Sequence, residues 1–194
     1  MHSRRLFTAV ALASLLGCAQ APSRRLAAAQ RPLDAVRLYV WAGKDGVLQR
    51  ESLERLARTL QLNGLPVEDG PVWLDRPLAD VAALQRSWNG SAHVEGASHA
   101  LVLTRQRLDS FGGANYVRYE AVLWEAGSHA LVWQATLASA VNDRSVDRAR
   151  RGDMLAGDVL RGLSRDHLFE LRGGVPRDDS GSEIPATLVP LQLR

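Results

Sequence analysis

The stretch from residue 116 to residue 135, YVRYEAVLWEAGSHALVWQA, decides the fold of this 194-residue chain. Two runs rich in β-branched and aromatic residues flank the polar break at residues 125–128, which is typical of a tight hairpin connection. We predict antiparallel strands over Tyr116–Trp124 and His129–Leu137. Alternate side chains of the two strands are expected to share one buried face; they are Val117, Tyr119, Ala121, Leu123, Leu131, Trp133, Ala135 and Leu137.

Working outward, a third strand is predicted over His99–Leu108, just upstream of the hairpin. Downstream, Val146–Phe169 predicts a long helix, and Gly173-Gly174 follows its end. The helix is predicted because its apolar residues recur at helical spacing on one side; they are Met154, Leu155, Val159, Leu163 and Leu168.

The amino-terminal half predicts a strand over Ala35–Trp41 and a helix over Arg50–Leu62, stopped by Asn63-Gly64. The helix carries Leu53, Leu56, Ala57 and Leu60 at helical spacing. Residues 65–74 predict a short edge strand, because two prolines interrupt them. A second helix is expected to begin near Pro77, with Leu78, Val81, Leu84 and Trp88 along one side.

This order of elements predicts an α+β fold: a two-layer sandwich in which a mixed, mostly antiparallel sheet carries helices packed on one face. We expect four regions along the chain. They are a signal peptide over residues 1–17, a lipidated flexible tether over 18–34, a single domain over 35–172 and a carboxyl-terminal extension over 173–194.

The first 17 residues have the pattern of a bacterial export signal. Arg4 and Arg5 precede an uncharged apolar run, which is shorter than the roughly 20 residues that a membrane-spanning helix needs. The run closes on Leu15-Leu16-Gly17-Cys18, which resembles the lipobox of bacterial lipoproteins. That resemblance implies cleavage between Gly17 and Cys18, a diacylglycerol on the Cys18 thiol with palmitate as the expected acyl chain, and a domain held at a membrane by this anchor.

Two further features of this region concern export and sorting. Residues 3–7 are similar to the start of a twin-arginine signal, which leaves the route open between folded and unfolded export. Ala19 follows the cysteine where the enteric sorting rule places the aspartate of inner-membrane lipoproteins. The expected location is therefore the periplasm-facing side of the outer membrane.

The charge of the mature chain argues against nucleic acid as a partner. The signal takes Arg4 and Arg5 with it and leaves 177 residues, in which 22 basic side chains stand against 21 acidic ones. A nearly neutral chain lacks the excess of positive charge that binding to a phosphate backbone requires.

The hairpin, together with residues 153–163 (DMLAGDVLRGL), resembles small proteobacterial envelope lipoproteins of uncharacterised function. These resemble in turn the fold of curli-secretion and peptidoglycan-synthase-activating lipoproteins and of the TolB amino-terminal domain. The resemblance covers roughly residues 35–170. It implies a partner-binding or assembly role among other envelope proteins, and it carries over no catalytic residue and no cofactor.

Motifs for catalysis and for metal binding are absent from the sequence. His93, His99, His129 and His167 lack the close spacing of zinc signatures, so surface or strand-end positions are expected for them. Ser128 and His129 are adjacent, but neighbouring strand residues point to opposite faces. Other acidic residues are expected to form a solvated face with nearby arginines or to lie in a flexible loop; they are Asp143, Asp147, Asp153, Asp158, Asp178 and Asp179.

The tryptophans are the remaining functional hint. Trp41, Trp124 and Trp133 lie on predicted strands, where core packing is the ordinary role, and they are a candidate binding surface if exposed. The sequence therefore favours a non-enzymatic envelope lipoprotein that binds another protein. A binder of a small ligand or lipid is the alternative, and an unrecognised hydrolase ranks last.

Overall fold

The computed structural model describes residues 18–19, 22–44, 48–77, 97–111, 114–140, 147–187 and 189–190. The strands and helices in chain order are β1 (Cys18–Ala19), β2 (Ser23–Arg25), β3 (Val36–Trp41), α1 (Arg50–Leu62), β4 (Val72–Trp73), β5 (His99–Phe111), β6 (Ala114–Glu125), β7 (Leu131–Ala140), α3 (Arg148–Arg165) and β8 (Val189–Pro190).

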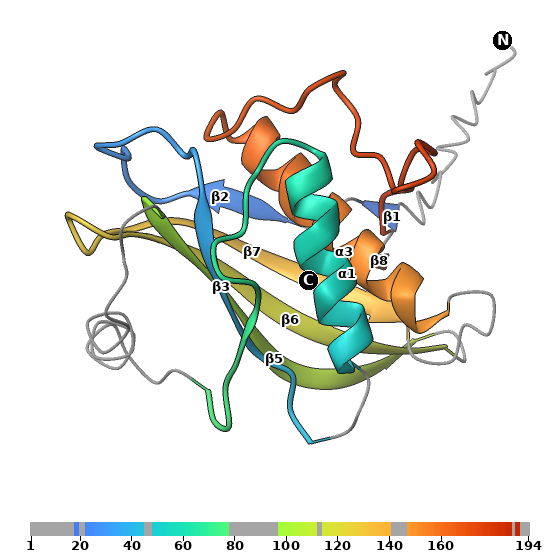
Figure 1. The fold of residues 1–194 in the computed structure, drawn as a ribbon. Coiled ribbons are helices and arrows are strands. Elements are labelled where there is room, and N and C mark those ends of the chain that lie inside the picture. The colour runs from blue at the N-terminus through green and yellow to red at the C-terminus, as the bar shows by residue number, and fades with distance from the viewer. Residues whose placement is uncertain are drawn as a thin grey trace, which may run out of the picture.

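The main sheet has six strands in the order β2-β7-β6-β5-β3-β4. The strand β3 runs parallel to both of its neighbours, β5 and β4, and all the other pairs are antiparallel. Both described helices pack on the same face of this sheet (Figure 1). The predicted α+β class, with a mixed and mostly antiparallel sheet, is confirmed.

The hairpin predicted from residues 116–135 forms, but Leu131 departs from the expected pairing: a register shift places it opposite Trp124, outside the buried cluster. Tyr119 lies opposite Leu137, and Leu123 lies opposite Trp133, so the apolar positions of β6 and β7 share the face that the helices cover. Most of the side chains on this face are fully buried, Trp133 and Tyr119 among them. Burial of such large side chains supplies most of the driving force for folding.

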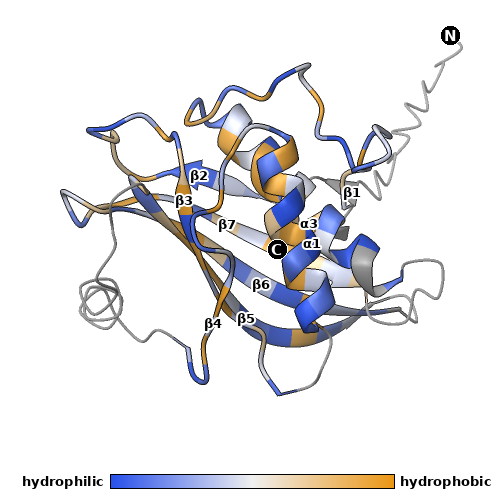
Figure 2. Ribbon diagram, viewed as in Figure 1, coloured by the Kyte–Doolittle hydropathy of each residue, from blue (hydrophilic) through white to orange (hydrophobic). Residues whose placement is uncertain are grey.

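Local contacts and backbone conformation explain the start of α3 and the ends of both helices. The side chain of Asp147 accepts a hydrogen bond from the Arg150 amide at 2.7 Å, which caps the start of α3. Gly64, with φ of 92°, ends α1 where the sequence predicts a stop. The helix α3 ends at Arg165 rather than Phe169, because His167 takes a φ of 56° that an α-helix does not allow. Along both helices hydrophilic and hydrophobic residues alternate (Figure 2).

The two helices approach each other very closely. A Cβ built on Gly152 of α3 would lie 2.1 Å from the Ser52 backbone oxygen of α1. Glycine is therefore required at this crossing, because any larger residue would push the helices apart.

Part of the segment expected to be a flexible tether, residues 18–34, is folded onto the domain in the structure. Residues 23–25 form β2, which pairs antiparallel with β7 and makes one edge of the main sheet. Leu33 and Ala35 are buried, so the segment joins the domain before residue 35. The low-complexity composition suggested a linker, but the open edge of β7 provides backbone partners that the sequence does not reveal.

Other sequence predictions are met only in part or concern residues that the structure does not describe. The predicted strand over residues 65–74 forms a ladder only at β4, and Val67 adds an isolated bridge to Val36. In the carboxyl-terminal extension, β8 pairs with β1. The helix expected near Pro77, the signal peptide and Gly17 lie outside the described residues. No helix in the described part of the chain is long and apolar enough to span a membrane.

Candidate functional site

A buried histidine lies where β5 begins. His99 is fully buried, and its Nδ1 lies 2.8 Å from the Ser98 hydroxyl. That hydroxyl in turn donates to the Asp34 carboxylate at 2.5 Å. Because the serine has one proton to donate, Nδ1 of His99 carries the ring proton and donates it to Ser98. Its other nitrogen, Nε2, is buried and has no hydrogen-bond partner among the described residues.

Glu125 lies directly opposite His99, across the pairing of β5 with β6. Its carboxylate is buried and accepts hydrogen bonds from the Arg31 amide, at 2.6 Å, and from the Ser128 hydroxyl. Burial opposes ionisation of Glu125, but these hydrogen bonds outweigh it and the pKa of this carboxyl lies below its usual value. The carboxylate is therefore ionised at neutral pH.

The same surroundings keep His99 neutral. Burial lowers the pKa of this imidazole below its usual value and outweighs the attraction of Glu125 and Asp34 for the charged form. We call the set Asp34, Ser98, His99, Glu125 and Ser128 the His99 cluster. It pairs a neutral histidine with two carboxylates at one end of the sheet.

The hydrogen bonds of the His99 cluster do not activate a serine. A nucleophilic serine must pass its proton to an acceptor nitrogen of histidine. Here the Ser98 proton goes to Asp34, and Ser98 accepts from His99. The arrangement joins the segment before β3 to the ends of β5 and β6. Sequence reasoning missed it because its members come from separate segments, and only the strand pairing brings them together.

The three candidate tryptophans do not share one surface. Trp133 is fully buried under α3, and its indole nitrogen donates to Asp166 at 2.8 Å, so it belongs to the core and the candidate binding role is wrong for it. Trp41 and Trp124 are half-buried. Trp73, on the edge strand β4, is the more accessible one at 39% exposure.

Trp124 belongs to an apolar cluster on the sheet face away from α1 and α3. We call it the second-face cluster; it consists of Tyr39, Ala100, Val102, Val72, Leu74, Val122, Trp124 and Ala126. Its central members Tyr39 and Val102 are buried, while Trp124 and Val122 remain partly exposed. Exposed aromatic side chains on such a face are typical anchors for protein partners.

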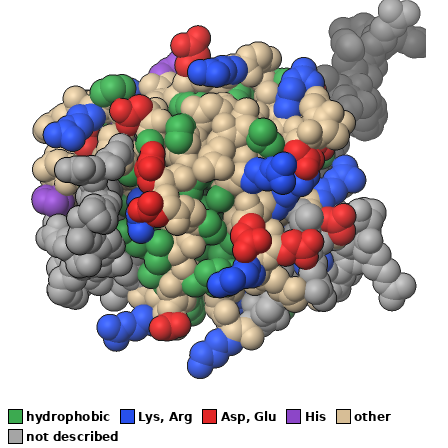
Figure 3. All heavy atoms as spheres, viewed as in Figure 1, with side chains coloured by type: hydrophobic (Ala, Val, Ile, Leu, Met, Phe, Trp, Pro, Cys, Tyr) green, Lys and Arg blue, Asp and Glu red, His purple; other side chains and the backbone are tan. Residues whose placement is uncertain are grey.

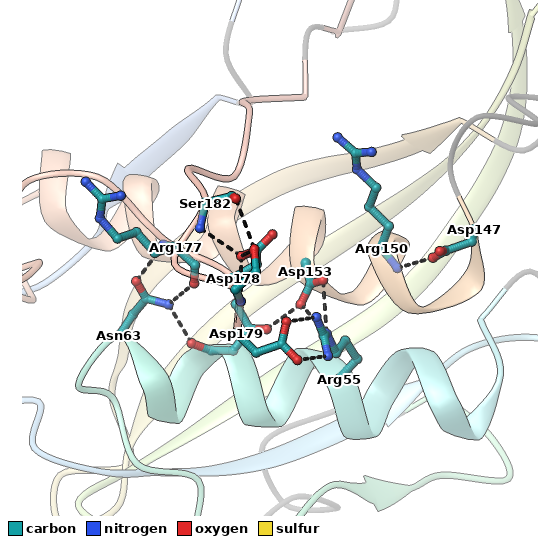
Figure 4. A network of polar contacts seen from close by, with 11 residues as sticks. Arg55, Asn63, Asp147, Arg150, Asp153, Arg177, Asp178, Asp179 and Ser182 are labelled. Carbon is teal, nitrogen blue, oxygen red and sulfur yellow. Dashed lines mark hydrogen bonds and ion pairs between the residues drawn. The ribbon is translucent and has the colours of Figure 1, made fainter.

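A network of charged groups joins α1, α3 and the carboxyl-terminal loop (Figure 4). The Arg55 Nε donates to both carboxylate oxygens of Asp153, at 2.9 and 3.0 Å, and its two terminal nitrogens bind Asp179. Asp153 also accepts from the Thr59 hydroxyl at 2.5 Å. These contacts raise the pKa of Arg55 above its usual value, chiefly through Asp179 and Asp153. Paired in this way, the groups hold the loop to both helices.

The loop itself is shaped by polar side chains. Asp178 accepts bonds from the amides of Ser180 and Ser182, and Asn63 donates to and accepts from the backbone of Arg177. A cleft of about 340 Å³ opens beside it, lined by polar and charged side chains such as Arg150, Asp178 and Glu183. Acidic and basic side chains are also interspersed over the face shown in Figure 3.

The expected solvated face on the last helix is wrong for two of its carboxylates. Asp153 and Asp158 are each 5% exposed, and Asp147 caps the helix as described above. Asp158 accepts from Arg161 at 2.7 Å and from the Thr187 amide at 3.2 Å. Burial nevertheless raises the pKa of Asp158 above its usual value. Asp143 lies outside the described residues.

Asp158 and Arg161 together hold the carboxyl-terminal segment against α3. The Arg161 guanidinium donates to the backbone oxygens of Ile184, at 2.8 Å, and of Pro185, at 3.1 Å. A few residues later β8 pairs with β1, and Cys18 lies opposite Pro190. The expected lipid-attachment residue is thus paired with a segment that is fixed to the domain.

The two other described histidines lie far from each other along the chain. His129 and His167 lie at separate turns with positive φ, and His93 is outside the described residues. Among the residues that the structure describes, no three His, Cys, Asp or Glu side chains are grouped closely enough to hold a metal ion.

No protein-family model and no curated protein sequence matches this chain. Solved structures to which this chain shows some likeness include the PelC dodecamer from Paraburkholderia phytofirmans, at 16% identity and a TM-score of 0.44, covering 77% of this chain and 99% of that one. Lipoprotein GNA1162 from Neisseria meningitidis is 16% identical with a TM-score of 0.36, covering 68% and 96%. Protein XCC0632 from Xanthomonas campestris is 17% identical with a TM-score of 0.24, covering 71% and 83%.

These likenesses are slight and carry no argument about function. The expected resemblance to curli-secretion lipoproteins and to the TolB amino-terminal domain stays a prediction.

Proposed function

We propose that the chain is a lipid-anchored protein of the bacterial cell envelope whose domain binds another envelope protein and catalyses no reaction. The observation that carries the proposal is the second-face cluster, which places partly exposed Trp124 and Val122 on the sheet face away from α1 and α3. Aromatic and aliphatic side chains that lose water on contact supply most of the energy of protein association.

The position of Cys18 supports the anchoring part of the proposal. Four residues separate it from Ser23, the first residue of β2. A chain of this length spans at most about 18 Å, so a lipid on Cys18 would hold the domain close to the membrane. Ala19 favours the outer membrane, as the sorting rule for such anchors implies.

The His99 cluster supports the non-enzymatic part. Its serine donates to a carboxylate and not to the histidine, so it lacks the acceptor that a hydrolase serine needs. No member of the His99 cluster lines the polar cleft beside Arg150. An unrecognised hydrolase therefore remains the weakest of the candidate functions.

A binder of a small apolar ligand would need space between the sheet and the helices. The side chains there pack into one continuous cluster of buried residues. Gly162 of α3 lies so close to the Trp133 ring that an added Cβ would be 2.7 Å from it. Packing this close does not favour a ligand chamber in the described core.

Anchoring is tested by labelling with a palmitate analogue in a bacterial host that processes lipoproteins. We expect the wild type to carry the label and Cys18→Ala to carry none. Ser23→Ala, which leaves the cysteine in place, is the control and should be labelled normally. A Cys18→Ala protein that still carries acyl chains would refute the anchor.

Partner binding is tested by crosslinking in living cells from a photoreactive residue at position 122, a partly exposed member of the second-face cluster. Leu62 on α1 is the control position, because it is exposed and lies on a helix that packs against the opposite face of the sheet. We expect a discrete crosslinked protein from position 122 and none from position 62. Crosslinking at neither position, or equally at both, would contradict the second face as a docking surface.

A further inference from the structure

We propose that residues 22–33, folded along the edge of the sheet, form a surface that docks onto anionic phospholipid headgroups beside the anchor. The inference rests on the lipid anchor proposed above. It adds that the domain does not swing freely on its lipid but lies against the membrane with one defined edge.

The charge of this segment is one-sided. It contains Arg24, Arg25 and Arg31 and no aspartate or glutamate, in a mature chain whose charges otherwise nearly cancel. All three arginines are exposed. Between them lies Leu26, which is also exposed, at 39%. Arginines around an exposed apolar residue are typical of surfaces that lie at a membrane interface.

The end of α3 extends the positive surface. The Arg165 guanidinium is 42% exposed and donates to the Ser23 hydroxyl at 2.5 Å, which places it beside β2. Asp166 forms an ion pair with Arg165 at 3.9 Å, but it is only 14% exposed and also accepts hydrogen bonds from Ser23 and Trp133. Among the described residues of β2 and of the end of α3, the exposed charges are therefore positive.

The short distance along the chain between this surface and Cys18 keeps the surface near the membrane. Arg24 and Arg25 follow Cys18 by six and seven residues, a distance of at most about 25 Å when fully extended. Because β2 is fixed to β7, this edge cannot turn away from the anchor without unpairing from the sheet. A guanidinium binds phosphate through two parallel hydrogen bonds, which suits lipid headgroups.

The test uses the full, lipidated protein with a fluorophore on Ala28→Cys, an exposed position inside the segment. The lipid occupies the native cysteine, so the new thiol is the one that reacts. The protein is reconstituted in vesicles of phosphatidylcholine alone or mixed with phosphatidylglycerol, each with nitroxide-labelled headgroups. We expect quenching to rise at least about twofold in the anionic vesicles and to fall again at high salt.

The control variants separate this surface from general charge effects. Arg24→Glu with Arg25→Glu should abolish the difference between the two vesicles, whereas Arg58→Glu with Arg76→Glu, both exposed but distant in sequence from the segment, should preserve it. Equal quenching in both vesicles, or no effect of the first pair, would overturn the docking surface. The mass of the acyl chains is measured on the same sample. If the acyl chains are missing, the proposed anchor is overturned as well. If they are present and the quenching result is negative, only the docking surface is overturned.

Discussion

Trp133 of β7 and Asp166, just after α3, are joined by a hydrogen bond of 2.8 Å from the indole nitrogen to a carboxylate oxygen. The same oxygen accepts the Ser23 hydroxyl at 2.5 Å. One carboxylate thus ties together the buried ring of the core, the end of the last helix and the edge strand next to the proposed anchor. This junction explains why a segment with the composition of a linker is part of the folded domain.

Replacing Asp166 by alanine should destabilise the fold. The indole N–H of Trp133 and the Ser23 hydroxyl would both lose their acceptor, and a buried donor without a partner costs about 1–3 kcal/mol. Urea unfolding measures the change. Asp75→Ala, at an exposed position, is the control and should stay within about 0.5 kcal/mol of the wild type. Equal stability of the two variants would show that the junction does not hold β2 in place.

Replacing Gly152 by alanine tests the close helix crossing. Alanine is the better helix former by about 1 kcal/mol. Its Cβ would nevertheless lie 2.1 Å from the Ser52 oxygen, and overpacking of this kind costs roughly 1–3 kcal/mol. We therefore expect net destabilisation. Gly127→Ala is the matched control, because its nearest neighbour is a side-chain atom of Arg31 at 3.7 Å. A Gly152→Ala protein more stable than the wild type would mean that the helices are farther apart.

Asp158 should make stability fall as pH rises. Its pKa in the folded state is raised by burial, so the folded protein holds this proton more tightly than the unfolded chain does. Its contribution is fully present below the unfolded value of 3.8 and is lost as pH rises through the folded pKa. In unfolding experiments Asp158→Asn, which does not ionise, should gain stability relative to the wild type as pH rises over this range. A pH-independent difference between the two proteins would contradict the shift.

Titration of His99 should change stability in the opposite direction, so that stability falls as pH decreases. Its folded pKa is lowered by burial below the ordinary 6.5, so the unfolded chain takes up a proton more readily. Its contribution is present above pH 6.5 and is lost as pH falls through the folded pKa. His99→Asn should remove this loss between about pH 7.5 and pH 5, because asparagine keeps a donor for Ser98 but does not titrate. The exposed His167→Asn is the control, and the His99 prediction fails if both variants show the same pH dependence.

Much of the architecture could be predicted from local patterns. The alternation in residues 116–135 specifies a hairpin with one buried face, and the spacing of Leu53, Leu56 and Leu60 specifies an amphipathic helix. Both patterns come from side chains near each other in the chain. The helix end at Arg165 was predicted four residues too late, because the apolar spacing continues through Leu168 after the backbone has left the helix.

The candidate site was less predictable. The His99 cluster joins residues from three segments, and the Arg55 network joins two helices to a loop more than 120 residues away along the chain. No local pattern marks such partners, since hydrogen-bond geometry depends on how distant segments pack. Asp153 and Asp158 have the spacing of a solvated helix face in the sequence, but the structure buries both of them.

The sequence by itself determined the strands β3, β5, β6 and β7, the helices α1 and α3 and the fold class, and it carries the pattern that resembles a lipobox at Cys18, because each depends on neighbouring residues only. Tertiary structure alone decided that Trp133 is core while Trp124 lies on the second face, and that residues 23–25 are an edge strand instead of a tether. The physical reason is the same in both cases. Whether a side chain is buried, and whether a backbone edge finds a partner, depends on surfaces that form only when the sheet and helices come together.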